Sequence, residues 1–110
     1  MITSIEPGYY ETGNFGIRIE NLYITVAVPA DSPSLSGNNT TKKFCLFEPL
    51  TLVPIKTNIA DKSLLSREDI DWVNAYHKQV REKLLPLMKE LFPEAVSYLI
   101  RDTEKLPYSC

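Results

Sequence analysis

The most constraining feature of this sequence is a Gly-rich turn flanked on both sides by short, alternating, β-branched runs, all within residues 1–21. The left flank, Met1–Glu6, and the right flank, Phe15–Asn21, each have the pattern of a β-strand that ends at or passes through a glutamate. The Pro and Gly residues between the flanks can turn the chain back on itself. The pattern therefore predicts two adjacent antiparallel strands that bring Glu6 and Glu20 close together.

Two carboxylates on neighbouring strands allow two interpretations. Converging oxygen ligands are what a hard or borderline divalent cation needs, so Glu6 and Glu20 are candidate metal ligands. A pair of acidic side chains on adjacent strands is usually surface charge, however, and two ligands do not complete a coordination sphere. Spacing alone leaves both interpretations open.

The identities of the residues are more specific than their spacing. Glu-Pro-Gly-Tyr-Tyr at residues 6–10 and Phe-Gly-Ile-Arg-Ile-Glu-Asn at residues 15–21 closely resemble the last two metal-ligand motifs of the pita-bread metallopeptidases, specifically the Xaa-Pro aminopeptidases (aminopeptidase P). The segments at residues 47–55, 71–77 and 99–104 resemble the C-terminal extension of the eukaryotic cytosolic type. The resemblance therefore covers nearly the whole chain.

This resemblance implies an α+β fold. Residues 1–55 would be the terminal antiparallel strands of a pita-bread catalytic domain, and residues 56–110 a helical C-terminal extension. Met1 would correspond to an internal position of a longer protein, so we expect a C-terminal fragment of an aminopeptidase P. Such enzymes remove the N-terminal residue from peptides with proline in second position. In cytosolic relatives the C-terminal region takes part in dimer contacts, which implies a cytoplasmic homodimer.

The resemblance also implies roles for three side chains. In the family, two Asp, one His and two Glu hold two divalent ions, usually Mn²⁺, that activate water for attack on the peptide. By motif, Glu6 would be a metal ligand and the candidate general base, and Glu20 would bridge both ions. Arg18 would orient the Glu20 carboxylate through paired hydrogen bonds. A surface ion pair is the alternative for Arg18.

The sequence departs from the family pattern in one large respect. No Asp pair precedes Glu6, and the metal-binding and substrate-binding histidines are absent. Because the affinity of oxygen sites rises with ligand number and preorganisation, we expect the chain alone to bind metal weakly or not at all and to lack peptidase activity. Two alternatives remain: a dimerising interaction module formed by the extension after Ile55, and a standalone binding protein that reuses the motif.

His77 is the only histidine, and it lies on an apolar helical stripe. It allows a metal or acid–base role, but a lone histidine at such a position is more often packed and hydrogen-bonded. The family also takes its histidine ligand from an upstream segment, so we expect a structural role. Trp72 and Tyr76 lie one helical turn apart and are expected to serve packing or an interface rather than a ligand cage.

Local patterns predict the remaining elements. Residues 18–30 favour a long strand, and a shift in the parity of its apolar residues indicates a bulge near Glu20. Prolines limit residues 44–55 to an edge strand or a broken pair that can pair with the preceding strand. Ser66 has the form of an N-cap before a helix of about 20 residues, which Pro86 would kink or divide. The predicted apolar stripe of that helix is Ile70, Val73, His77, Val80, Leu84, Leu87 and Leu91.

Charge and composition argue against several classes of function. A net charge of −2 gives no electrostatic case for nucleic-acid binding, and no apolar run approaches the roughly 20 residues of a membrane span. Cys45 and Cys110 form no motif, which indicates reduced thiols rather than a disulfide. Residues 29–41 are predicted to form a polar loop. The sequons at Asn38 and Asn39 within it have meaning only in a secreted protein.

Overall fold

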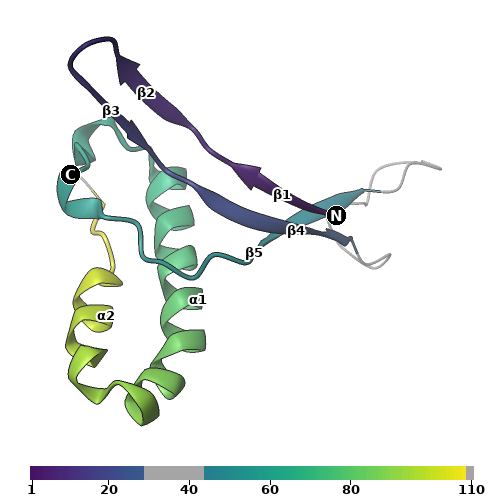
Figure 1. The fold of residues 1–110 in the computed structure, drawn as a ribbon, viewed down its shortest axis with the longest axis vertical. Helices are drawn as coiled ribbons and strands as arrows, with labels where there is room; N and C mark the ends of the chain where they lie inside the picture. The colour runs from purple at the N-terminus through teal and green to yellow at the C-terminus, as the bar shows by residue number, and fades with distance from the viewer. Residues whose placement is uncertain (29–43, 109–110) are drawn as a thin grey trace. The chain divides into compact units, whose positions relative to one another are not determined.

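The computed structural model describes residues 1–28 and 44–108 of the chain. It has two compact units, Met1–Thr51 and Leu52–Cys110 (Figure 1). The first is built from antiparallel strands and the second from helices, which confirms the predicted α+β class. The assignment of residues 1–55 to a catalytic domain and of the remainder to its extension stays a prediction.

Some of the sequence predictions fall on residues outside this description. They are the polar loop at residues 29–41, the sequons at Asn38 and Asn39, and the thiol of Cys110. Cys45 is described and is an exposed free thiol. Among the helices of residues 1–28 and 44–108, none is long and apolar enough to cross a membrane.

The first unit is a long antiparallel hairpin with one added strand. Its strands are β1 (Ile2–Ile5), β2 (Gly8–Glu11), β3 (Phe15–Arg18), β4 (Asn21–Ala27) and β5 (Cys45–Pro49). β1 pairs with β4, and β2 pairs with β3, while β5 pairs with the other side of β4. In Figure 1 the chain runs on from β1 into β2 and returns through β3 into β4. β5 is an edge strand, as its prolines predict.

The register of the hairpin is the same in both ladders. In the first ladder Ile5 lies opposite Asn21. In the second ladder Gly8 lies opposite Arg18. Between the ladders one side of the hairpin has residues 6–7 and the other has residues 19–20, so the number is two on each side. The predicted bulge near Glu20 is therefore wrong, because a bulge requires an extra residue on one of the two strands.

Particular residues explain where the ladder of the hairpin is interrupted and where the chain turns. The interruption includes Pro7, which has no N–H to donate, although its carbonyl accepts a hydrogen bond from the Ile19 N–H at 3.0 Å. At the far end Gly13 has a φ of 81°, a conformation that favours glycine. Asn14 closes the turn by donating its backbone N–H to the Glu11 carbonyl at 3.0 Å and its side-chain amide to the Glu11 carboxylate at 2.9 Å.

The unbroken register also changes which side chains share a face. Without a bulge, Ile17 and Ile19 lie on one face and Leu22 lies on the opposite one. All three are 45% to 50% exposed, whereas Asn21 and Tyr23 are buried. Ile17 and Leu22 therefore do not belong to one apolar face.

The second unit is organised around α1 (Arg67–Leu91). Ser66 caps the helix as predicted and forms a capping box with Asp69. The Ser66 Oγ accepts from the Asp69 N–H at 3.1 Å, and the Asp69 carboxylate accepts from the Ser66 N–H at 2.9 Å. Leu65, which precedes the cap, packs against the cluster that contains Ile70. This contact is a hydrophobic staple, which fixes the entry of the chain into the helix.

The shorter helices of this unit are η2 (Thr57–Ile59), η3 (Lys62–Leu64), η4 (Pro93–Ala95) and α2 (Val96–Asp102). Pro93 opens η4, which continues into α2. α1 extends through Pro86 to Leu91, so Pro86 does not divide the helix, and the alternative of a kink stays a prediction. The proline removes one backbone hydrogen bond. Packing of the side chains around it against the core offsets that loss.

The predicted stripe on α1 is correct in its first half. Its buried members are Ile70, Val73, His77 and Val80. Further along, Leu87 and Leu91 are 55% and 60% exposed, contrary to the prediction. Leu84, a predicted member of the stripe, packs against the cluster that includes Leu99 of α2, and so do the neighbouring Leu85 and Met88. Which side of α1 is covered is decided by where α2 packs.

Polar side chains on α1 fasten the chain that follows α2. The Asn74 amide donates to the Leu106 carbonyl at 3.1 Å, and its oxygen accepts from the Leu106 N–H at 2.8 Å. Arg81 donates to the Thr103 hydroxyl at 2.7 Å and to the Ile100 carbonyl at 2.8 Å. These bonds satisfy backbone groups that irregular structure leaves without partners.

Candidate functional site

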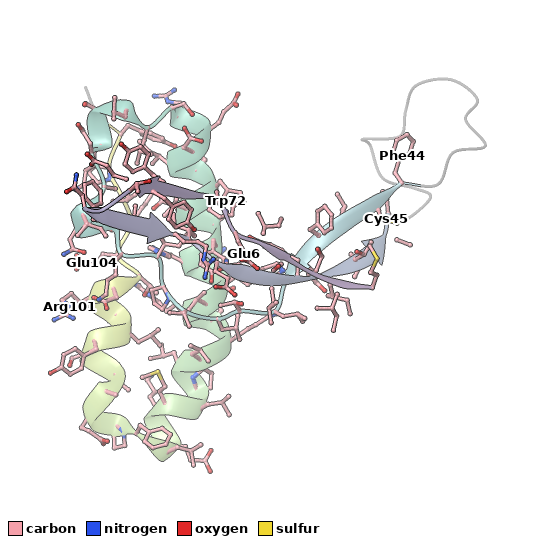
Figure 2. The ribbon with its side chains drawn as sticks, turned by 45° about the horizontal axis from the view of Figure 1, so that its top comes forward. Glu6, Phe44, Cys45, Trp72, Arg101 and Glu104 are labelled. Atoms are coloured by element: carbon pink, nitrogen blue, oxygen red, sulfur yellow. The ribbon has the colours of Figure 1, made fainter. Side chains whose placement is uncertain are left out.

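The candidate site lies where the two ladders of the hairpin meet. Because the register is unbroken, Glu6 lies opposite Glu20 in the gap between the ladders. Arg18 precedes Glu20 by two residues, so the period of a strand places all three side chains on one face. The structure thus brings the three predicted site residues together (Glu6 is labelled in Figure 2).

The Arg18 guanidinium bridges the two carboxylates. Its Nη1 lies 3.5 Å from Glu6 Oε2, and its Nη2 lies 3.5 Å from Glu20 Oε2. The side chains are 48% exposed for Arg18, 37% for Glu6 and 52% for Glu20. Ion pairs this exposed contribute at most about 1 kcal/mol each to stability. The arrangement instead offsets the repulsion between two like charges that face each other across a strand pair.

The two carboxylates of the cluster are of the kind that can bind a metal ion. Two carboxylates on one face supply the oxygen ligands that a hard divalent cation prefers. Over residues 1–28 and 44–108, however, no three His, Cys, Asp or Glu side chains lie close enough together to hold a metal ion. The described residues therefore fit two ligands of a larger site, and the roles of Glu6, Glu20 and Arg18 at a metal remain predictions.

Two glycines beside the cluster make room for the ring of Tyr10, a residue that the sequence analysis did not single out. Tyr10 lies opposite Gly16, where a β-carbon would come within 2.7 Å of the ring. A β-carbon at Gly8 would come within 2.6 Å of the Tyr10 hydroxyl. The ring therefore lies along the face that carries Arg18, which is opposite Gly8. In the sequence, Gly8 and Gly16 are the residues that indicate the place of the Tyr10 ring.

His77, in the second unit, has the environment of a structural residue. Its side chain is 1% exposed, and its Nε2 accepts a hydrogen bond from the Ile55 N–H at 3.1 Å. The predicted packed and hydrogen-bonded role is confirmed. Burial lowers the pKa of His77, while the backbone of Glu104 opposes that shift in part. The neutral imidazole, with Nε2 as acceptor, is therefore the form that the fold prefers.

Trp72 and Tyr76 stack on each other, with ring centroids 5.8 Å apart and planes inclined by 5°. Tyr76 is buried and donates its hydroxyl to the Val53 carbonyl at 2.8 Å. The predicted packing role is confirmed for Tyr76. Trp72 is 51% exposed, and a role for it in an interface stays a prediction.

Comparison with known proteins adds a family and several relatives. A family model described as the C-terminal region of peptidase M24 matches residues 43–106. Protein pid-5 of Caenorhabditis elegans is 49% identical over 84 residues, which are 76% of this chain and 7% of that protein. Aminopeptidase P2 of Arabidopsis thaliana is 48% identical over 89 residues, 81% of this chain and 12% of that protein. Xaa-Pro aminopeptidase 2 of Sus scrofa is 39% identical over 107 residues, which are 96% of this chain and 15% of that protein.

A solved structure is also similar. It is the X-prolyl aminopeptidase of Caenorhabditis elegans, described as a cytosolic enzyme with a di-nuclear active site. The TM-score is 0.81 at 37% sequence identity, over 96% of this chain and 16% of that one. The match confirms the predicted fold, the strands of a pita-bread fold followed by helices. The chain spans 7% to 15% of the length of the three curated relatives.

Proposed function

Because this chain belongs to the C-terminal region of the peptidase M24 family, we propose that it supplies two metal ligands and the helical extension of a Xaa-Pro aminopeptidase. The observation that carries this proposal is the convergence of Glu6 and Glu20 on the guanidinium of Arg18. The similarity to Xaa-Pro aminopeptidases and to an enzyme with a di-nuclear site supports it. The proposed substrate is a peptide with proline in second position.

In this proposal, Glu6 and Glu20 hold two divalent ions together with ligands that the described residues do not provide. Glu6 and Glu20 would be metal ligands, with Glu20 shared between the ions, and Glu6 would also act as the general base. Carboxylate oxygens suit Mg²⁺, Ca²⁺ and Mn²⁺, and we infer Mn²⁺ from the resemblance to the Xaa-Pro aminopeptidases. When bound, the ions supply Lewis-acid chemistry that polarises the peptide carbonyl and lowers the pKa of water. Arg18 orients both carboxylates, which would otherwise repel each other.

The proposal predicts that the isolated chain of 110 residues does not hydrolyse a Xaa-Pro peptide in the presence of Mn²⁺. Two carboxylates cannot preorganise two ions, so metal affinity is expected to be weak. A chimera that carries this chain in place of the matching 16% of the C. elegans enzyme is expected to cleave the peptide. Release of the N-terminal residue measures activity, and calorimetry with Mn²⁺ measures binding.

Each result can contradict a separate part of the proposal. Turnover by the isolated chain would show that the other ligands are unnecessary. A folded chimera that binds Mn²⁺ but does not cleave the peptide would contradict the proposed function.

A second candidate function is a non-catalytic dimerisation module in the extension, and the same surface would make the parent enzyme a cytoplasmic homodimer. The observation that favours it is the exposed apolar side of α1. Leu87 and Leu91 are 55% and 60% exposed and lie one turn apart, and Phe92 follows at 57% exposed. Exposed apolar patches of this kind mark interaction surfaces.

We expect the chain to sediment as a dimer at high concentration, and the double change Leu87→Glu and Leu91→Glu to weaken that dimer at least about tenfold. The reason is that burying one leucine contributes about 1.5–3 kcal/mol. Leu64→Glu is the matched control, since Leu64 is 80% exposed in η3, outside this helical side. Sedimentation velocity at several concentrations decides the question. A monomer throughout that range would exclude the module.

A further inference from the structure

The second unit contains a cavity of about 460 Å³ that the proposed peptidase chemistry does not use. Residues from two separate stretches line it, 55–62 and 101–107. The first stretch carries η2 and the start of η3, and the second leaves the end of α2. Ile55, Leu106 and Pro107 form its apolar lining. A cavity of this size is in the range of small-molecule sites.

The remaining lining residues give this cavity an excess of positive charge. Its cations are Lys56, Lys62, Arg101 and Lys105, and its carboxylates are Asp102 and Glu104. Arg101 and Glu104 are labelled in Figure 2, where the chain leaves α2. Four cations against two carboxylates leave two positive charges in a chain whose net charge is −2. A cavity whose lining has a net positive charge concentrates ligands of negative charge.

Asp102 holds two of these cations in place. Lys56 Nζ contacts one carboxylate oxygen, and Arg101 Nε donates to the other at 3.0 Å. The hydrogen bonds from Lys56 and then from Arg101 lower the pKa of Asp102, which keeps the carboxylate ionised at neutral pH. Lys56 and Arg101 share the single carboxylate of Asp102, so these three side chains together carry a net positive charge. The two contacts also restrict the motion of the Lys56 and Arg101 side chains.

We propose that this cavity binds a small dianion, namely the phosphate group of a phosphate monoester. The two surplus charges match a phosphate dianion, and guanidinium and ammonium groups are its usual protein ligands. Thr57 and Asn58 add neutral side chains that can hydrogen-bond to its oxygens. The apolar lining accommodates the organic part of the ester. The site shares no residue with the Glu6, Arg18 and Glu20 cluster.

The test is a titration of the full chain with inorganic phosphate and with phenyl phosphate at constant ionic strength, followed by amide chemical shifts in NMR spectra. We expect saturable shifts in residues 55–62 and 101–107. The double change Lys62→Gln and Lys105→Gln is expected to weaken binding about tenfold or more, since each lysine can donate a charge-assisted hydrogen bond to the dianion. The double change Lys83→Gln and Lys89→Gln removes the same charge from α1, outside the cavity.

The outcomes separate the possibilities. Tighter binding of phenyl phosphate than of inorganic phosphate supports the monoester, whereas equal or weaker binding would overturn that assignment in favour of free phosphate. Equal weakening by both double changes, or shifts that never saturate, would overturn the site altogether. Lys62 and Lys105 are exposed, so loss of the fold is not expected. Unchanged amide shifts elsewhere verify this.

Discussion

Changing Glu20 to Gln in the chimera with the C. elegans enzyme is expected to lower kcat for a Xaa-Pro peptide by about 10³-fold or more. Glutamine keeps the shape of the side chain but loses the negative charge that a bridging ligand shares between two cations. Metal ions contribute several kcal/mol to the transition state, and about 1.4 kcal/mol corresponds to a factor of ten in rate. Metal content, measured by atomic spectroscopy, is expected to fall with activity.

A matched control lies on the same hairpin. Glu11 is also an exposed glutamate, but it accepts a hydrogen bond from Asn14 in the turn and lies beyond the ladder junction. Glu11→Gln is expected to keep both metal and activity. If Glu20→Gln retained full activity and full metal content, the metal-ligand role of Glu20 would be refuted. Equal losses in both variants would indicate a damaged hairpin instead.

The second large effect concerns stability. His77→Leu is expected to destabilise the second unit by about 2–4 kcal/mol. The change leaves the Ile55 N–H without its acceptor, which costs about 1–3 kcal/mol when the donor is buried, and the imperfect fit of leucine adds to this. His77→Gln, which retains an acceptor, is expected to lose less. Urea unfolding followed by circular dichroism measures the change.

A control for this measurement is available on the same helix. Lys78→Ala removes an exposed pair with Glu82, whose atoms are 3.8 Å apart, and is expected to cost less than about 0.5 kcal/mol. A loss for His77→Leu no greater than that of Lys78→Ala would mean that the Ile55 hydrogen bond does not contribute.

The same residue makes stability depend on pH. The pKa of His77 is lowered in the folded protein, so the neutral form is favoured by folding. Its contribution is fully present above the unfolded pKa of about 6.5 and is lost as pH falls through the lower folded pKa. Asp102 titrates well below that range because its own pKa is lowered. We expect stability to fall as pH drops below about 6.5 in the wild type and much less in His77→Gln.

Short-range signals in the sequence predicted much of this fold. Ser66 is the predicted N-cap, and the structure adds a capping box with Asp69. A cap can be predicted because it depends on residues within one turn of each other. β5 lies at an edge because a proline cannot donate to a second neighbour. Each of these features depends on a few adjacent residues, so it is visible before any tertiary contact is known.

The incorrect predictions all required knowledge of a partner element. The parity of apolar residues suggested a bulge near Glu20, but pairing with β1 and β2 sets the register, and the two ladders agree. The parity shift arises because both faces of the strand carry apolar residues. A bulge is therefore not needed to bring the apolar residues to one face. Leu87 and Leu91 looked like core residues, but α2 packs on another side of α1.

By itself, the sequence determined that Arg18 and Glu20 share a face, because they stand two residues apart on one strand. Only the tertiary structure decided that Arg18 reaches both carboxylates, since that depends on the register between strands. It also decided where the positive cavity lies. Lys56 and Arg101 are far apart in sequence, and folding brings both to one carboxylate, that of Asp102. Charges that meet through folding leave no local pattern in a sequence.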